Sequence, residues 1–247
     1  MVATPADVLR VLEQDPDLAA ALDADERPLA EQHLVAAEVR VPRGPWRHEH
    51  HLGGAAADLG FLVLDGVLLR ETEIGRHSAG ELLGPGDLLR PWDYAEGALT
   101  PVTTVSSWRV LEPVRLAVLD QRFATLAVRF PTVIAALVAR TLRRSRFQAL
   151  LLTAAAMPRL DARLLVVLWH VADRWGRVTP DGTQVVVRLT HEILARLVVA
   201  QRPSVSTALK GLERAGLVAR DAETGGLVLI GPPPDDPERT VEASAAH

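Results

Sequence analysis

Residues 189–220 read LTHEILARLVVAQRPSVSTALKGLERAGLVAR and contain two short amphipathic helical patterns separated by a four-residue break. The first pattern follows Thr190, a residue type that caps helix N-termini, and the second ends before Gly216, a common helix stop. In both patterns apolar residues recur at helical spacing, namely Ile193, Leu194, Leu197, Val198, Val205, Leu209 and Leu212. The segment therefore predicts a helical hairpin that buries one face.

The opposite face of the second pattern is neutral to basic, because no acidic residue lies between Ile193 and Leu212. In the DNA major groove arginine pairs with guanine, glutamine with adenine, and hydroxyl groups with phosphates or bases. We therefore expect this face to bind DNA, although an ordinary surface hairpin is the alternative. The expected contacts are Gln201 and Arg202 to bases, Ser204, Ser206 and Thr207 to bases or phosphates, and Thr190 and Lys210 to phosphates.

Short apolar runs on both sides of the hairpin indicate small β-hairpins. Residues 217–218 and 227–230 enclose the turn sequence ETGG, and residues 185–187 follow the turn PDG at 180–182. This arrangement predicts a winged helix-turn-helix. It resembles that of the Crp/Fnr (catabolite activator-like) superfamily of bacterial transcription regulators, with a threonine opening the first helix, an arginine opening the second and a lysine eight residues later.

The segment departs from the family pattern at three positions. Val199 stands where the family usually has the turn glycine, and a β-branched residue tolerates a positive φ poorly. Pro203 replaces a usual glutamate, and Thr207 stands where many members have a second arginine. The resemblance therefore does not imply a particular operator sequence.

Residues 39–119 consist of short apolar runs punctuated by glycine turns, which predicts a β-sandwich or barrel. The hairpin LDGV at 64–67 and the turn LGPGDL at 83–88 resemble the cyclic-nucleotide-binding jelly-roll of the same superfamily. Residues 7–22 and 27–37 have helical spacing. The expected fold class is thus α+β, with an N-terminal jelly-roll β-barrel, a long dimerisation helix and a C-terminal winged helix-turn-helix.

Residues 131–156 contain no acid, no glycine and no proline after the first position, which predicts one long helix. A coiled-coil seam follows from residues spaced by four and three, namely Ile134, Val138, Leu142, Ser145, Ala149 and Leu152. The position of this helix matches the dimer helix of the Crp/Fnr family and favours a homodimer. A single long core helix within a monomer is the alternative.

The charge distribution separates the chain into regions. Residues 1–130, the expected sensor domain, carry a net charge of −8, and the dimerisation helix at 131–156 carries +4. The expected DNA-binding domain at 157–231 is basic up to residue 220, with +5, and residues 221–247 carry −5. A basic module beside an acidic one confines phosphate attraction to the former. The proline-rich segment 232–247 is expected to be a disordered tail.

The resemblance also bears on ligands. Cyclic-nucleotide-binding members have a glycine–glutamate pair for the ribose and an arginine with serine or threonine for the phosphate. Here Pro91 and Trp92 stand at the first pair and Thr104 and Val105 at the second, so we expect no cyclic nucleotide and no cofactor. The effector is unknown, and candidate residues for its pocket are Arg90, Trp92, Tyr94, Thr104 and Arg109.

Other chemistry is disfavoured by composition and motifs. The chain has no cysteine, which excludes disulfides and cysteine-held iron–sulfur clusters. The run HEHH at 48–51 fits a solvated loop better than a metal site, and no nucleophile elbow or phosphate loop indicates an enzyme. Without an 18-residue apolar run or a signal pattern, we expect a cytoplasmic protein with no membrane partner.

Together these features predict a homodimeric, sequence-specific transcription regulator that binds a palindromic operator in double-stranded DNA. RNA polymerase is a candidate partner. The alternative function is a small-molecule or cyclic-nucleotide sensor whose winged helix contacts protein rather than DNA.

Overall fold

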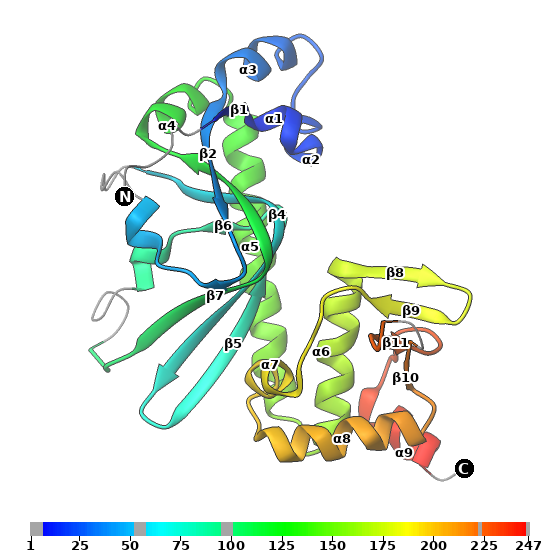
Figure 1. Ribbon diagram of the computed structural model, residues 1–247. Helices are drawn as coiled ribbons and strands as arrows, with labels where there is room; N and C mark the ends of the chain where they lie inside the picture. The colour runs from blue at the N-terminus through cyan, green and yellow to red at the C-terminus, as the bar shows by residue number, and fades with distance from the viewer. Residues whose placement is uncertain (1–6, 52–57, 95–100, 222–223, 246–247) are drawn as a thin grey trace. The chain divides into compact units, whose positions relative to one another are not determined.

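The computed structural model describes residues 7–51, 58–94, 101–221 and 224–245 (Figure 1). The chain divides into two compact units, Met1–His77 with Leu82–Phe147, and Ser78–Glu81 with Gln148–His247. The division falls within the long helix α5 (Pro131–Ala155), whose predicted existence is confirmed. The α+β fold class is also confirmed.

The first unit is built around one antiparallel sheet. Its strand order is β1-β2-β7-β4-β5, with β3 paired to β7 and β6 to β4, and among the described residues the sheet does not close into the expected barrel. The strands are β1 (Val8–Arg10), β2 (Val35–Val41), β3 (Gly44–Pro45), β4 (Gly60–Ile74), β5 (His77–Leu83), β6 (Leu88–Leu89) and β7 (Val105–Leu119). The helices are α1 (Val11–Gln14), α2 (Pro16–Ala19), α3 (Arg27–His33) and α4 (Gln121–Ala127), with 3-10 turns at His48–His51 and Pro91–Tyr94.

Two sequence predictions in this unit were wrong. Residues 8–10 and 35–37, expected to be helical, form paired strands, because the pairing of β1 with β2 joins residues far apart in sequence. Asp65-Gly66, expected as a hairpin turn, lies inside β4 at an irregular register. Gly66 has a φ of +83°, and a Cβ there would lie 2.2 Å from the Pro113 carbonyl oxygen, so the close approach to β7 requires glycine.

Helix α5 is anchored to the N-terminal helices by a buried ion pair. Arg140 binds both carboxylate oxygens of Asp15, with an Nη2–Oδ1 distance of 2.7 Å. Both side chains are buried, and Asp15 also accepts the backbone N–H of Leu18 at the start of α2. The Asp15 carboxylate raises the pKa of Arg140. This pair fixes which face of α5 turns toward the unit and which turns away.

The second unit contains the predicted helical hairpin beside a four-stranded sheet of order β10-β11-β9-β8. Its helices are α6 (Leu160–Trp175), α7 (His191–Leu197), α8 (Arg202–Arg214) and α9 (Pro237–Ala245). Its strands are β8 (Gly176–Thr179), β9 (Gly182–Val185), β10 (Val218–Arg220) and β11 (Leu227–Leu229).

The prediction of a disordered tail at 232–247 was wrong over α9. Asp236 precedes this helix and accepts the N–H of Arg239, while Val241 is buried and Glu242 lies 3.4 Å from Arg159. The helix packs against α6 and α8. The low apolar content of the segment is typical of disorder, and a single buried valine gives no pattern from which the helix could be predicted.

His170 on α6 gives the second unit a predicted pH dependence. Burial, together with the charge of Arg174, lowers the pKa of its imidazole to about 4. The unfolded chain, with an ordinary pKa of 6.5, takes up the proton first, so stability falls as the pH drops from about 6.5 toward 4.

Between pH 7 and pH 5 we expect a loss of about 1 kcal/mol in the free energy of unfolding, reduced from the full shift because the ring is partly exposed. Urea titrations of wild type and His170→Gln measure this difference. Equal pH slopes for the two proteins would contradict it.

No single helix in the described part of the chain is long and apolar enough to cross a membrane; α4 and α5, which meet at a 117° bend, satisfy the length and composition test only as a pair.

Candidate nucleic-acid interface

Helix α8 buries the apolar face that the sequence predicts. Val205, Leu209 and Leu212 are at most 1% exposed. Gly216 follows with a φ of +68°, and the N–H of Leu217 returns to the Leu212 carbonyl, which is a standard helix end. The helix therefore has a fixed interior face and presents its other side to solvent.

The exposed side of α8 carries the expected polar residues. Gln201, Arg202, Ser204, Thr207 and Lys210 are exposed. Gln201 is the N-cap residue, yet its side chain makes no capping hydrogen bond. Thr207 donates its hydroxyl to the Pro203 carbonyl. The amide of Gln201 and the guanidinium of Arg202 are therefore free to contact a ligand at the start of the helix.

Ser206 differs from its neighbours because it is half-buried and faces α7. Its hydroxyl donates to the Arg202 carbonyl at 3.1 Å, so it accepts a hydrogen bond from Nδ1 of His191, 2.8 Å away. His191 was not among the site residues predicted from the sequence, because a single polar residue in the first helix does not indicate a contact with Ser206. The bond ties the start of α7 to α8 and limits how far Ser206 can reach outward.

Thr190 lies at the N-cap of α7, as predicted. Its hydroxyl oxygen accepts the backbone N–H of Ile193 at 3.2 Å, and the residue is exposed. The hydroxyl proton remains available to an acceptor such as a phosphate oxygen.

The turn between α7 and α8 adopts a strained conformation at Val199. This residue has a φ of +51° and is the only non-glycine residue with a positive φ in the described ranges. Its neighbour Val198 accepts a hydrogen bond from Nη1 of Arg163 at 3.0 Å, while Nη2 of the same arginine binds the Met157 carbonyl at 2.7 Å. Arg163, on α6, was also missed from the sequence, and it holds the turn in place.

Replacing the strained valine should stabilise the protein. A left-handed φ costs a β-branched residue on the order of 1–3 kcal/mol, more than glycine loses in chain entropy. We expect Val199→Gly to raise the free energy of unfolding by about 1 kcal/mol in urea titration.

The matched control is Val186→Gly, since Val186 is an exposed valine of the same unit at ordinary φ. This control should lose stability. A loss of stability in Val199→Gly as well would show that the turn is not strained.

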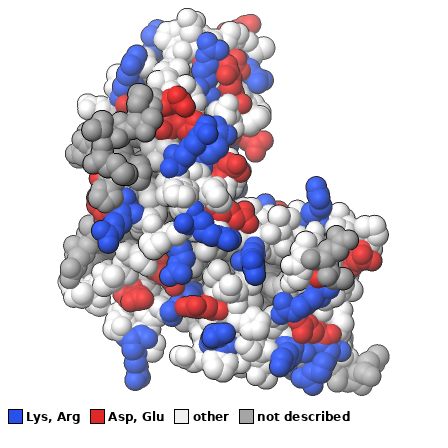
Figure 2. Space-filling model, in the orientation of Figure 1, with Lys and Arg blue, Asp and Glu red and all other residues white. Residues whose placement is uncertain are grey.

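The surface around α8 is basic. Figure 2 shows Lys and Arg side chains among uncharged ones along the lower edge of the molecule, where this helix lies. Its only acidic residue, Glu213, lies 3.0 Å from Arg220 and is thereby neutralised. The positive charges of Arg202, Lys210 and Arg214 are thus not compensated along the helix.

The predicted seam on α5 is largely exposed in the single chain. Val138, Leu142 and Leu152 are 52%, 54% and 75% exposed, and Ser145 and Ala149 are exposed as well. Ile134 is half-buried and packs partly against the core of the first unit. The helix therefore carries an apolar stripe that its own chain does not cover.

Of the residues expected to form an effector pocket, Arg90 and Trp92 contact each other. Arg90 binds Asp93 at 2.7 Å and stacks on Trp92, with 5.0 Å from its guanidinium carbon to the ring centroid. Thr104 is half-buried and Arg109 is exposed on β7, and no described hydrogen bond joins either to Arg90. The side chain of Tyr94 lies outside the described residues.

Aromatic side chains fill the interior of the sheet in this region. Trp46 packs edge-to-face on Phe61 and Trp108, with ring centroids 5.5 and 5.8 Å apart, and all three are buried. The Trp92 ring also packs edge-to-face on Phe61, with ring centroids 6.2 Å apart. Arg90, one of the expected pocket residues, is engaged by Asp93.

His48–His51 form a 3-10 turn, and burial lowers the pKa of His48. The side chains of His50 and His51 lie outside the described residues, so the expectation of a solvated loop rests on the sequence. Among the residues that the structure describes, no group of three or more His, Asp or Glu side chains could hold a metal ion.

Comparison with known proteins supports this architecture. Residues 162–231 match the Crp-like helix-turn-helix domain. The chain resembles a CooA mutant from Carboxydothermus hydrogenoformans, with a TM-score of 0.62, 17% identity, and coverage of 99% of this chain and 97% of that chain. No curated protein matches the sequence.

Two other solved structures show the same fold. One is the c-di-GMP-responsive global regulator CLP from Xanthomonas campestris, with a TM-score of 0.57, 19% identity, and coverage of 85% of this chain and 100% of that chain. The other is a CRP-family transcriptional regulator from Thermus thermophilus, with a TM-score of 0.55, 22% identity, and coverage of 85% of this chain and 97% of that chain. These solved structures share the predicted fold, and the predicted helix-turn-helix is confirmed by the match of residues 162–231 to the Crp-like helix-turn-helix domain.

Proposed function

We propose that this chain, which has the Crp/Fnr regulator fold and a Crp-like helix-turn-helix domain, is a sequence-specific transcription regulator that binds a palindromic operator as a homodimer. One observation carries the proposal. Helix α8 has a sealed apolar back, and its exposed front bears an amide, hydroxyls and uncompensated basic groups. A helix of this kind can enter the major groove and read base edges there.

The residues proposed to contact DNA divide by their positions on the two helices. Gln201 and Arg202 at the start of α8 are proposed to contact bases, and Thr190 and Lys210 to contact phosphates. Ser204 and Thr207 are exposed and can reach either. Ser206, held by His191, is proposed to act mainly by fixing the orientation of α8.

The exposed stripe on α5 supports a dimer. Val138, Leu142 and Leu152 lie at coiled-coil spacing, and a second copy of α5 would cover them. In such a dimer two copies of α8 would enter successive major grooves about 34 Å apart, so half-sites would be centred about 10 base pairs apart. RNA polymerase is a candidate partner of the DNA-bound dimer.

Selection of bound duplexes from a random pool tests the function and identifies the operator. We expect recovered sequences to converge on an inverted repeat with half-sites about 10 base pairs apart, and affinity to fall steeply with salt. A pool that remains random, or an absence of duplex binding at low ionic strength, would refute the function.

Arg202→Ala should weaken binding to that operator by about 1–3 kcal/mol and relax the preference at one base position. The reason is that the guanidinium is exposed at the helix start and unpaired among the described residues. Fluorescence anisotropy with the selected duplex measures the loss. Arg177→Ala, at an exposed arginine on β8, is the matched control and should bind normally. Equal affinities of all three proteins would remove Arg202 from the interface.

A sensor whose winged helix contacts protein is the second candidate. This second function is favoured only if the purified protein does not bind DNA and an acidic partner protein binds α8. The basic surface of α8 could bind either DNA phosphates or an acidic protein. A duplex titration at several salt concentrations separates the two functions.

A further inference from the structure

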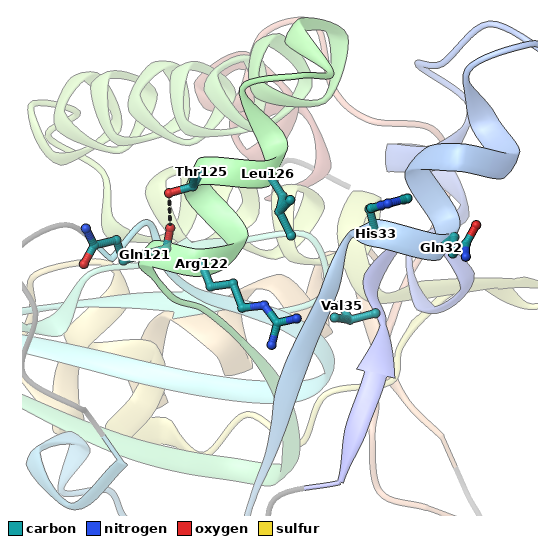
Figure 3. Close-up of a pocket in the computed structure, with 7 residues that line it drawn as sticks. All are labelled: Gln32, His33, Val35, Gln121, Arg122, Thr125 and Leu126. Atoms are coloured by element: carbon teal, nitrogen blue, oxygen red, sulfur yellow. Dashed lines mark hydrogen bonds between the residues drawn. The ribbon is translucent and has the colours of Figure 1, made fainter.

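The first unit contains a cavity of about 610 Å³ between α3, the start of β2 and α4 (Figure 3). Figure 3 shows Arg122 and Leu126 of α4 facing His33 and Val35 across it, and Gln32, Gln121 and Thr125 complete the lining. The volume is in the range of small-molecule sites. None of the residues expected to bind an effector lines this cavity.

Arg122 is a cation without a partner. Its side chain is exposed, and within the described ranges no hydrogen bond or ion pair engages it. The carboxylates of the same segment make hydrogen bonds to the backbone: Asp120 accepts the N–H of Phe123, and Asp58 accepts the N–H of Gln121. On the side of α3, Glu31 lies 2.8 Å from Arg27. Arg122 forms no ion pair with a described carboxylate, so its guanidinium is available to an anion that enters the cavity.

The lining contains no acidic residue, although residues 1–130 carry 20 acidic and 12 basic side chains. His33 adds a second polar group, because its Nδ1 donates to the Leu29 carbonyl at 2.8 Å and leaves Nε2 to bind something else. Val35 and Leu126 supply half-buried apolar surface between these groups. One cation beside two aliphatic side chains suits an anion with an apolar body.

We propose that this cavity binds a small organic carboxylate, with the carboxylate on Arg122 and the apolar part against Val35 and Leu126. A guanidinium holds a carboxylate through two parallel hydrogen bonds, which a neutral or cationic compound cannot make. The cavity is open to solvent on one side, so the affinity for simple acids is modest.

A ligand there contacts the segment that leads into the dimerisation helix. Phe123, Ala127, Phe130 and Val133 are buried in one core cluster that joins α4 to the start of α5, and Leu126 packs against the same cluster. A bound carboxylate thus stiffens the base of α5. Its role as an effector rests on the proposed function, whereas its binding does not.

Isothermal titration of the full chain with 4-phenylbutyrate tests the site, with 4-phenylbutanol as the uncharged analogue. We expect saturable binding with a Kd on the order of 1 mM or tighter for the acid, and no saturation by the alcohol. Arg122→Gln should weaken the acid about 10-fold or more, while Arg129→Gln, at an exposed arginine outside the cavity, should not.

Two results would overturn the proposal. One is a lack of saturation by the acid up to about 10 mM, well above the expected affinity. The other is equal binding by wild type and Arg122→Gln, which would place the acid elsewhere. Duplex affinity of the same variants without the acid is measured in parallel. Unchanged duplex binding in Arg122→Gln separates a failure of the ligand site from a failure of the DNA-binding function.

Discussion

The Leu142→Glu substitution is expected to convert the proposed dimer to monomers and to weaken binding to the proposed operator about 100-fold or more. Leu142 is 54% exposed in the single chain, in line with Val138 and Leu152 along α5. In a dimer these side chains face their copies, so a glutamate at the centre would bury two carboxylates without partners. Each monomer would then hold only one half-site.

Sedimentation equilibrium measures the change directly, as a fall in mass to that of one chain, 26.7 kDa. The matched control is Arg143→Glu, which places the same new side chain at the adjacent, exposed position, about 100° around the helix from Leu142 and outside the predicted seam. That variant should remain dimeric. If Leu142→Glu remains dimeric, the dimer interface does not include this stripe. If the wild-type protein is monomeric, the proposed dimer is wrong.

The Arg140→Met substitution is expected to cost about 3–5 kcal/mol of unfolding free energy. It leaves the buried carboxylate of Asp15 without the guanidinium that binds both its oxygens, and water cannot replace it. Urea-induced unfolding followed by tryptophan fluorescence measures the loss. Removal of Asp15 as well, in the double variant Asp15→Ala with Arg140→Met, should recover part of it.

Arg143→Met is the control, since it removes an exposed arginine three residues along the same helix and should change stability by about 0.5 kcal/mol or less. If Arg140→Met costs no more than this control, the ion pair does not anchor α5. Because α5 carries the proposed seam, a loosened anchor should also weaken dimerisation at low protein concentration.

The sequence predicted the helix-turn-helix hairpin closely because its signals are local. Thr190 caps α7, Gly216 ends α8, and Val205, Leu209 and Leu212 are buried. The strain at Val199 was also predictable, since the turn of the resembled family needs a positive φ. Each signal lies within a few residues of the structure that it specifies.

The supports of that hairpin could not be predicted. Arg163 reaches the turn from α6, 35 residues away in sequence, and His191 binds Ser206 across 15. The ion pair of Asp15 with Arg140 spans 125 residues. No periodicity or spacing marks such pairs, because either partner alone reads as an ordinary polar residue.

The sequence by itself determined the helical hairpin, the long helix and the basic face of α8, because hydrophobic period, capping residues and charge act between neighbours along the chain. Only the tertiary structure decided that residues 8–10 and 35–37 are strands, that α9 packs on its unit, and that Arg122 faces a cavity. These features arise where distant segments meet, and the free energy of strand pairing or burial there exceeds the weak local preference for another conformation.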